Sequence, residues 1–163
     1  MACAPCAHVQ VGELNLGTSP VLSVSETTSA FETYVLLEKS RRSGVAIINA
    51  HGALVGNISA SDLKNFIKKP DVKKLQQPIK QFLTELRQES IDIHIPTIIV
   101  YQHSTLAHVA AKIKATRVHR VFVVDDDTHM RPISVISVTD VVAQMISPLG
   151  ADSASVGVEE SKE

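Results

Sequence analysis

Two short apolar runs lie close together in the second half of the chain. Val121–Val124 and Ile133–Ile136 consist mostly of β-branched residues, and a polar segment from Asp125 to Pro132 separates them. This pattern predicts two adjacent, largely buried strands joined as a hairpin. Because a hairpin brings its two outer ends to one edge of the sheet, we expect the residues before the first strand and after the second to lie close together.

The residues at these two ends have the chemistry of a phosphate and sugar site. The basic pair His119-Arg120 precedes the first strand, and Ser137-x-Thr139-Asp140 follows the second. An arginine fork matches phosphate oxygens, and a carboxylate can accept hydrogen bonds from two neighbouring sugar hydroxyls through its two oxygens. Ser-x-x-Asp is equally typical of a capping box at the start of a helix, so both interpretations stay open.

The chain contains this arrangement twice. Val45–Asn49 recurs as Val121–Asp125, 76 residues later, and the Ser-x-x-Asp motif at 59–62 recurs at 137–140, 78 residues later. The difference falls in the first hairpin turn, which is two residues shorter than the second. Matching elements in one order predict an α/β fold of the α+β kind, in which two β-α-β-β-α repeats pack around a pseudo-twofold axis.

Apolar periodicity predicts the other elements. We expect strands over 44–48, 54–58 and 95–100, and helices over 28–40, 59–66, 105–115 and 138–146. The first of these helices should turn four side chains toward the core, namely Phe31, Tyr34, Val35 and Leu37. A linking helix should begin at Pro70, and Pro78 should kink it or divide it in two.

These elements divide the chain into five parts. In order they are a flexible N-terminus at 1–12, a first repeat at 13–68, a linking helix at 69–92, a second repeat at 93–147 and a disordered acidic tail at 148–163. Cys3 and Cys6 lie in the first part, where no second cysteine pair exists to complete a four-ligand zinc site. We therefore expect a plain flexible terminus there and no metal site.

Composition argues against several classes of protein. With 44% hydrophobic residues among 163, the chain can form two small units with a shared core. The formal net charge of −1 gives no basic surplus for nucleic acid, and no apolar run approaches the roughly 20 residues that span a bilayer. The first ten residues lack the pattern of a secretory signal. We expect a cytoplasmic or nuclear protein without nucleic-acid or membrane partners.

The sequence also lacks the common catalytic motifs. It contains neither the Gly-x-x-x-x-Gly-Lys-Ser/Thr of P-loop hydrolases nor a Gly-x-Ser-x-Gly elbow. Its seven histidines are scattered, without a pair spaced to bind zinc beside an acid. We therefore expect a binding protein rather than an enzyme, with no catalytic residues and no cofactor other than a regulatory ligand.

Residues 16–147 resemble a tandem pair of CBS domains (cystathionine-β-synthase-type repeats), known together as a Bateman module. The resemblance rests on the repeated order of elements and on four motifs, which are Gly17-Thr18, Val118-His119-Arg120, Val124-Asp125 and the run at 135–142. Within this family, the chain is most similar to the C-terminal repeat pair of the gamma subunit of AMP-activated protein kinase.

The resemblance implies two nucleotide pockets between the repeats. In such repeats the Ser-x-x-Asp positions bind ribose, and here they are Ser59 with Asp62 and Ser137 with Asp140. One pocket would combine Thr18 with Ser137, Thr139 and Asp140. The reciprocal pocket would combine Ser59 and Asp62 with residues near Pro96. Adenine would lie between apolar strand edges in each pocket.

The basic residues differ between the two repeats. The resemblance assigns the His-Arg pair of the second repeat to nucleotide phosphate, but the first repeat has Ser-Gly at the matching positions. Two arginines just upstream in the first repeat would substitute for the pair. The expected phosphate-side residues are Arg41, Arg42 and Ser43 in the first repeat and Arg117, His119 and Arg120 in the second. We expect one strongly basic site and one weaker site.

The resemblance therefore implies a regulatory module that senses AMP, ADP or ATP. It would be a kinase gamma-type subunit or part of one, with a protein kinase or another enzyme as its partner. Two alternatives stay open, a stand-alone pair that binds another adenosyl ligand such as S-adenosylmethionine, and a purely structural dimerisation module. Gamma subunits contain four repeats and this chain contains two, so it is either a fragment or a homodimer. Apolar faces on the helices at 105–115 and 138–146 favour the homodimer.

Overall fold

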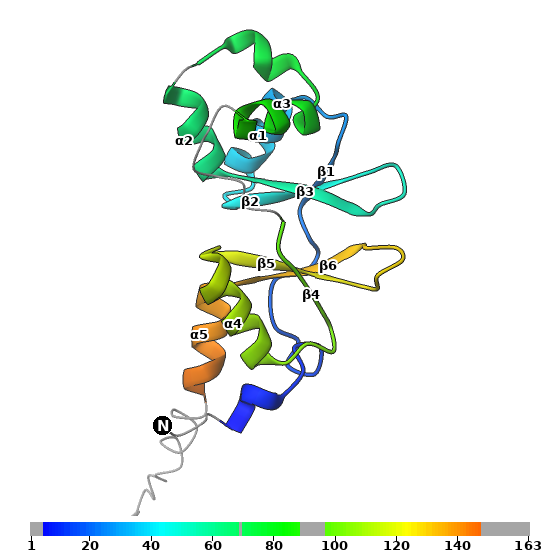
Figure 1. The fold of residues 1–163 in the computed structure, drawn as a ribbon, viewed down its shortest axis with the longest axis vertical. Coiled ribbons are helices and arrows are strands. Elements are labelled where there is room, and N and C mark those ends of the chain that lie inside the picture. The colour runs from blue at the N-terminus through cyan, green and yellow to red at the C-terminus, as the bar shows by residue number, and fades with distance from the viewer. Residues whose placement is uncertain (1–4, 69, 89–96, 148–163) are drawn as a thin grey trace, which may run out of the picture.

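Two three-stranded sheets face each other at the centre of the molecule, and helices cover their outer faces (Figure 1). The structure is a computed structural model that describes residues 5–68, 70–88 and 97–147. Cys3, Pro96 and the predicted tail at 148–163 lie outside the described residues, as do residues 69 and 89–92 of the predicted linking helix. The predicted α/β class with two packed repeats is confirmed.

The first repeat contains a sheet of order β1-β2-β3, with β1 parallel to β2 and β2 antiparallel to β3. Its elements are β1 (Ser23–Ser25), α1 (Ala30–Lys39), β2 (Gly44–Ile48), β3 (Leu54–Ser59) and α2 (Ala60–Lys68). A 3-10 helix, η2 (Val72–Gln76), and α3 (Ile79–Gln88) follow. The linking segment is thus divided beside Pro78, which confirms that part of the prediction, because proline cannot continue a helix without a break.

The second repeat has the same topology, with a sheet of order β4-β5-β6. Its elements are β4 (Ile99–Tyr101), α4 (Leu106–Thr116), β5 (Arg120–Val124), β6 (Pro132–Ser137) and α5 (Val138–Ile146). The register repeats as well, since Gly44 pairs with Ser59 and Arg120 pairs with Ser137. Gly44 and Arg120 are therefore equivalent positions of the two repeats.

The apolar side chains form three clusters. One lies between the first sheet and its helices, and another lies between the second sheet and its helices. The third lies between the two sheets, where Ala46 and Leu54 meet Phe122 and Val124, each of them no more than 8% exposed. Alternate residues of a strand point to opposite faces, so each central strand contributes to an outer cluster and to the one between the sheets.

The buried face of α1 differs from the prediction. Phe31 is 58% exposed, and the buried residues of this helix are Ala30, Thr33 and Leu37. Ser29 caps the helix, in a capping box with Glu32, so α1 begins later than residue 28. The buried stripe of α1 therefore runs through Ala30, Thr33 and Leu37, and Phe31 lies about 100° around the helix from Ala30, on the solvent side.

Residues 9–12 pack against the second repeat, although they precede the first. Val11 is 2% exposed, its N–H donates to the Ser104 carbonyl at 2.9 Å, and the N–H of Leu106 donates to the Val9 carbonyl at 3.0 Å. Thr18 then exchanges two backbone hydrogen bonds with Val135 of β6, at 2.8 and 3.1 Å. The prediction of a flexible N-terminus is therefore wrong for these residues.

None of the described helices combines the length and the hydrophobicity that a membrane crossing requires.

We expect Val11→Ala to lower the free energy of unfolding by about 1–3 kcal/mol, because it removes two buried methyl groups from the core of the second repeat. Val72→Ala is the matched control, since Val72 is 72% exposed on η2 and its truncation should change stability little. Urea denaturation of both variants measures the difference. Equal small effects would mean that residues 9–12 contribute nothing to the core.

Candidate functional site

Two cavities of similar size lie between the repeats. The first cavity, of about 280 Å³, is lined by Thr18, Pro20, Val21, Leu22, Arg41, Arg42, Ser43, Gly44, Arg120, Val135, Ser137 and Asp140. The second cavity, of about 290 Å³, is lined by Ser43, Asn57, Ser59, Ala60, Ser61, Asp62, Asn65, Arg87, Ile98, Arg117, Val118, His119, Arg120 and Phe122. Both volumes are near the lower end of the range for small-molecule pockets, roughly 300 Å³.

Each cavity combines an acid from one repeat with cations from the other. Asp140 of the second repeat lies in the first cavity with Arg41 and Arg42 of the first repeat. Asp62 of the first repeat lies in the second cavity with Arg117 and His119 of the second repeat. This crossed arrangement follows from the pseudo-twofold relation, which places the open end of one hairpin opposite the α-β connection of the other repeat.

The structure brings most of the predicted site residues together. Thr18, Ser137 and Asp140 share the first cavity, and Ser59 and Asp62 lie in the second with Ile98, close in sequence to Pro96. Thr139 is the exception, because it is exposed near the start of α5 and lines neither cavity. Ser137 and Asp140, the first and fourth residues of the motif, are the pair that a capping turn brings together.

His119 does not lie in the cavity of Asp140, where the ends of the hairpin led us to expect it. It lines the second cavity with Asp62, and of the His-Arg pair only Arg120 also reaches the cavity of Asp140. Consecutive residues at a strand entrance point to different sides, so two neighbouring side chains need not serve one site. The cationic and acidic ends of one hairpin are therefore shared between two cavities.

The Ser-x-x-Asp motifs are helix caps as well as cavity walls. Asp140 Oδ2 accepts from the backbone N–H and the hydroxyl of Ser137, at 2.7 and 2.8 Å, and the N–H of Asp140 donates back to Ser137 Oγ at 3.2 Å. Asp62 Oδ2 accepts the same two bonds from Ser59, at 2.8 and 2.9 Å. In both motifs these bonds use one carboxylate oxygen, Oδ2.

This geometry changes the predicted mode of ribose recognition. From the sequence we expect both carboxylate oxygens to accept from a sugar diol. Within the described part of the chain, the cap bonds of Asp62 and Asp140 leave Oδ1 as the oxygen without a protein partner. That oxygen has two lone pairs, and the cap fixes the orientation in which it points.

Arg120 lies where the two cavities meet. Its Nη2 donates to Ser43 Oγ at 2.6 Å, and both residues line both cavities. Burial lowers the pKa of Arg120, and the negative charge of Asp62 opposes that effect. The guanidinium stays protonated at neutral pH, so this partly buried cation is available to an anion from either side.

Two further residues of the second cavity were missed by the sequence argument. Arg87 comes from α3, and its Nη2 donates to the Asn57 carbonyl at 3.0 Å. The amide oxygen of Asn57 accepts from the Thr97 hydroxyl at 3.0 Å. Neither residue belongs to a motif, and only the path of the linking segment brings Arg87 to β3.

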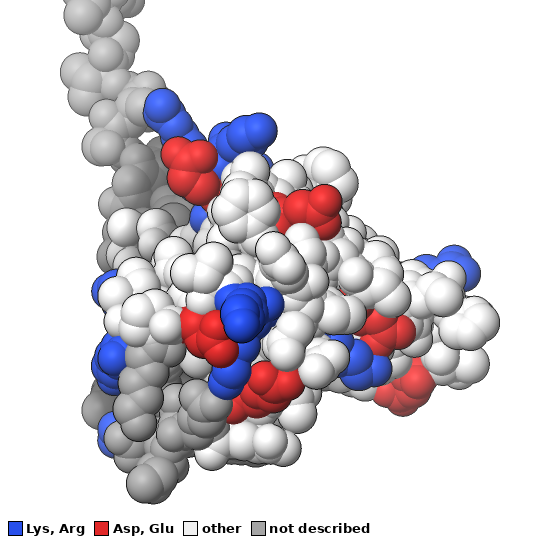
Figure 2. Space-filling model, turned by 90° about the horizontal axis from the view of Figure 1, so that it is seen from above, with Lys and Arg blue, Asp and Glu red and all other residues white. Residues whose placement is uncertain are grey.

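Arginines outnumber acids in both cavities. Arg41, Arg42 and Arg120 accompany one carboxylate in the first, and Arg87, Arg117 and Arg120 accompany one carboxylate in the second. Because each cavity has three arginines, the predicted contrast between a strong and a weak basic site is not visible in the described residues. On the face seen in Figure 2, basic and acidic side chains are interspersed. The excess of cations is thus a feature of the cavities, in a chain of net charge −1.

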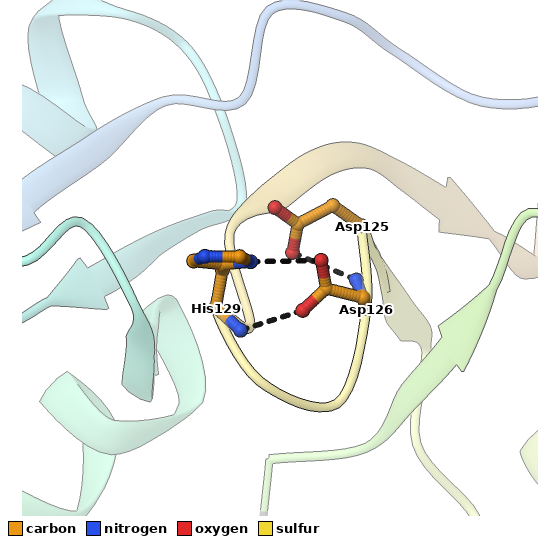
Figure 3. A group of neighbouring side chains, drawn as sticks. All are labelled: Asp125, Asp126 and His129. Carbon is orange, nitrogen blue, oxygen red and sulfur yellow. Dashed lines mark hydrogen bonds and ion pairs between the residues drawn. The ribbon is translucent and has the colours of Figure 1, made fainter.

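One group of possible metal ligands occurs among the described residues. Ligand atoms of Asp125, Asp126 and His129, in the turn between β5 and β6, lie within 4.8 Å of one another (Figure 3). The carboxylates already accept hydrogen bonds within the turn, and Asp126 receives them from the backbone of Thr128 and His129 at 2.8 and 2.6 Å. These bonds explain the cluster as the structure of a turn.

The turn should make stability depend on pH. Hydrogen bonds from the His129 side chain and backbone lower the pKa of Asp126 in the folded protein. A lowered pKa means that the ionised carboxylate stabilises the fold above its unfolded-state pKa, and that this contribution is lost as the pH falls through the folded-state value. We expect Asp126→Asn to destabilise the protein at pH 7 and to have progressively less effect as the pH falls through the folded-state pKa of Asp126. Urea denaturation at pH 7 and at a series of acidic pH values tests this, and a pH-independent difference would contradict it.

The comparisons with known proteins agree with this architecture. The family model described as CBS domain matches residues 11–69 and 89–147. Relatives include Protein sds23 of Aspergillus niger, 29% identical over 118 residues, and Protein SDS23 of Pyricularia oryzae, 30% identical over 121 residues. These matches cover 69% and 72% of this chain but only 23% of each relative, so the chain corresponds to about a quarter of their length.

Solved structures show the same fold. The structure of CBSX2 in complex with AMP has a TM-score of 0.63 and 22% identity, covering 86% of this chain and 98% of that one. The CBS domain pair of protein MJ0100, in complex with 5′-methylthioadenosine and S-adenosyl-L-methionine, has a TM-score of 0.62 and 20% identity, with the same coverage. At this level of identity the similarity concerns the fold. Since the family model matches both repeats, the chain belongs to the CBS domain family and forms a tandem pair, or Bateman module.

Proposed function

We propose that this chain is a regulatory module that binds adenine nucleotides in the cavities between its repeats. The observation that carries the proposal is the first cavity, where a carboxylate oriented by its helix cap lies with three arginines and an apolar wall. A nucleotide offers the matching groups, namely hydroxyls, an anionic phosphate and a planar base.

Each part of the ligand has a chemically suitable counterpart in the first cavity. Asp140 Oδ1 would accept from the ribose hydroxyls, beside Ser137 and Thr18. Arg41, Arg42 and Arg120 would donate to the phosphate, since their forked N–H groups fit its oxygens. The base would lie against four apolar residues, Pro20, Val21, Leu22 and Val135.

The second cavity would hold a second nucleotide in the same way. Asp62 and Ser59 would bind the ribose, and the base would lie against Ile98, Val118 and Phe122. Arg117, His119 and Arg87 would take the phosphate side together with Arg120.

The two solved structures support an adenosine-containing ligand, because one contains AMP and the other contains S-adenosyl-L-methionine with 5′-methylthioadenosine. Between a nucleotide such as AMP and S-adenosylmethionine, the arginines of the cavities favour the nucleotide. The sulfonium of S-adenosylmethionine is a cation and would meet Arg41 and Arg42, whereas a phosphate would be attracted by them.

The proposed role is regulation of a partner rather than catalysis. We extend it to an energy-sensing gamma-type subunit of a protein kinase or a part of one, with a kinase or another enzyme as the regulated partner. The relatives described above have the name Sds23, and this chain matches only 23% of each, so the activity of those whole proteins is not transferred.

We also propose that two copies associate through α4 and α5. Val138, Val142 and Ile146 form a row along one face of α5, and they are 38%, 50% and 56% exposed. Beside it, α4 has exposed alanines at 107, 111 and 115. The apolar row could pack into the alanine groove of a second copy, in an isologous contact that buries both.

The matching face of the first repeat has a different character. The equivalents of the three residues on α5 are Ala60, Lys64 and Lys68 on α2. An apolar row is therefore confined to the second repeat, and this makes a contact between two second repeats the simplest arrangement.

AMP should raise the melting temperature of the protein, and the shift should require Asp140. A ligand that binds only the folded state at a hundredfold excess over its Kd adds about 2.7 kcal/mol, which corresponds to several degrees for a chain of this size. Differential scanning fluorimetry should show this shift in the wild type and a much smaller one in Asp140→Ala and Asp140→Asn. 2′,3′-Dideoxyadenosine monophosphate, which lacks the diol, should give little shift.

Glu32→Ala is the matched control for Asp140→Ala. Glu32 occupies the equivalent position of the capping box at α1, outside both cavities. It should lower the melting temperature of the free protein and leave the AMP-induced shift unchanged. If Asp140→Ala behaves in the same way, Asp140 is only a capping residue and the proposed site is wrong.

The wild-type chain should have the mass of a dimer by light scattering at tens of micromolar. Val142→Asp places a charge in the middle of the apolar row and should give a monomer with unchanged secondary structure. Val72→Asp, on the exposed 3-10 helix η2, should remain a dimer. A monomeric mass for the wild type would disprove the proposed contact.

A further inference from the structure

Arg120 is the one arginine that lines both cavities among the described residues. Its guanidinium is held between them by the 2.6 Å hydrogen bond to Ser43 Oγ, and Ser43 also lines both cavities. The other arginines each belong to one cavity, Arg41 and Arg42 to the first and Arg87 and Arg117 to the second.

Gly44 explains why a single cation occupies this position. It is the equivalent of Arg120 in the first repeat, because Gly44 pairs with Ser59 as Arg120 pairs with Ser137. A Cβ atom at position 44 would overlap Nη1 of Arg120, so the guanidinium packs over the space that any side chain would fill. The pseudo-twofold symmetry is broken here, and two cavities share one central arginine.

We propose that the two cavities compete for Arg120, so that a phosphate-bearing ligand in one weakens binding in the other. The proposal rests on the nucleotide-binding function proposed above. A guanidinium whose forked N–H groups donate to a phosphate in one cavity can no longer donate in the same geometry to a phosphate in the other cavity. The second ligand then meets one arginine fewer.

The coupling must be reciprocal, since each ligand lowers the affinity of the other by the same factor. Losing a charge-assisted hydrogen bond corresponds to about a tenfold or larger loss of affinity. We therefore expect filling of one cavity to weaken the other at least tenfold. The remaining arginines keep both cavities able to bind.

Calorimetry with AMP can measure this coupling directly. Asp62→Ala disables the second cavity and Asp140→Ala disables the first, so each variant reports the association constant of the other cavity alone. In the wild type, the overall constant for filling both cavities should be at least tenfold smaller than the product of these two constants. The measured quantity is the ratio of the overall constant to the product of the two single-cavity constants. In the Arg120→Ala background this ratio should be near one, although each constant will be smaller.

Gly44→Ala provides a second test that removes no charge. The added methyl group should push the guanidinium away from its central position and bring the ratio closer to one. Gly56→Ala in β3 is the matched control, because its Cβ would make ordinary contacts of 3.6 and 3.8 Å with Ile47 and leave Arg120 in place. It should keep the wild-type ratio.

The possible outcomes separate this inference from the proposed function. Two AMP molecules that bind the wild type independently would overturn the sharing of Arg120 and leave nucleotide binding intact. If the ratio stays well below one in Arg120→Ala, the coupling between the cavities has another origin, and the sharing of Arg120 is also overturned. No AMP binding by the folded wild type would overturn the proposed function itself, and the coupling with it.

Discussion

The contact between the two sheets is the interaction on which the rest of the structure depends. Ala46 and Leu54 on one side and Phe122 and Val124 on the other are buried between two strand pairs of the same topology. This packing places the second repeat opposite the first, and the acid at the start of α5 then meets the arginines before β2. Neither repeat contains a complete cavity, so the apolar contact at the centre is also what assembles the polar groups at the edges.

The helix caps connect local stability with the chemistry of the cavities. In each Ser-x-x-Asp motif, the hydrogen bonds that start a helix also hold one carboxylate oxygen, and they leave the other in a fixed direction. A side chain fixed in this way loses little conformational freedom when a ligand arrives. The structural and the ligand-binding interpretations of the motif are therefore compatible.

The sequence predicted the features that depend on local patterns. The β-branched runs, the repeat and the division beside Pro78 all follow from short stretches of chain, and they correspond to the observed strands and helices. Within the candidate site, the pairing of Thr18 with Asp140 came from a family resemblance rather than from the residues themselves.

Features that depend on the path of the chain in three dimensions could not be predicted in this way. Val11 packs under α4 without any periodic pattern around it, and Arg87 reaches the second cavity from a helix that has no motif. His119 was assigned to the wrong side because neighbouring residues in the chain were assumed to face one site. Phe31 faces solvent because the buried stripe of α1 passes through Ala30, Thr33 and Leu37, and an apolar residue next to such a stripe does not reveal the difference in the sequence.

The path of the N-terminal segment limits which parts of the chain can be transferred to another protein as a packed unit. Residues 9–18 lie before β1, the first strand of the first repeat, yet they cover the second repeat, and Thr18 joins its sheet at β6. A gene fragment that encoded only the second repeat would lack this covering, and a fragment that ended after the first would carry it without the surface it protects. The smallest unit that can be moved or fused to another protein with this packing intact is thus the pair, even though each repeat has the same strand topology.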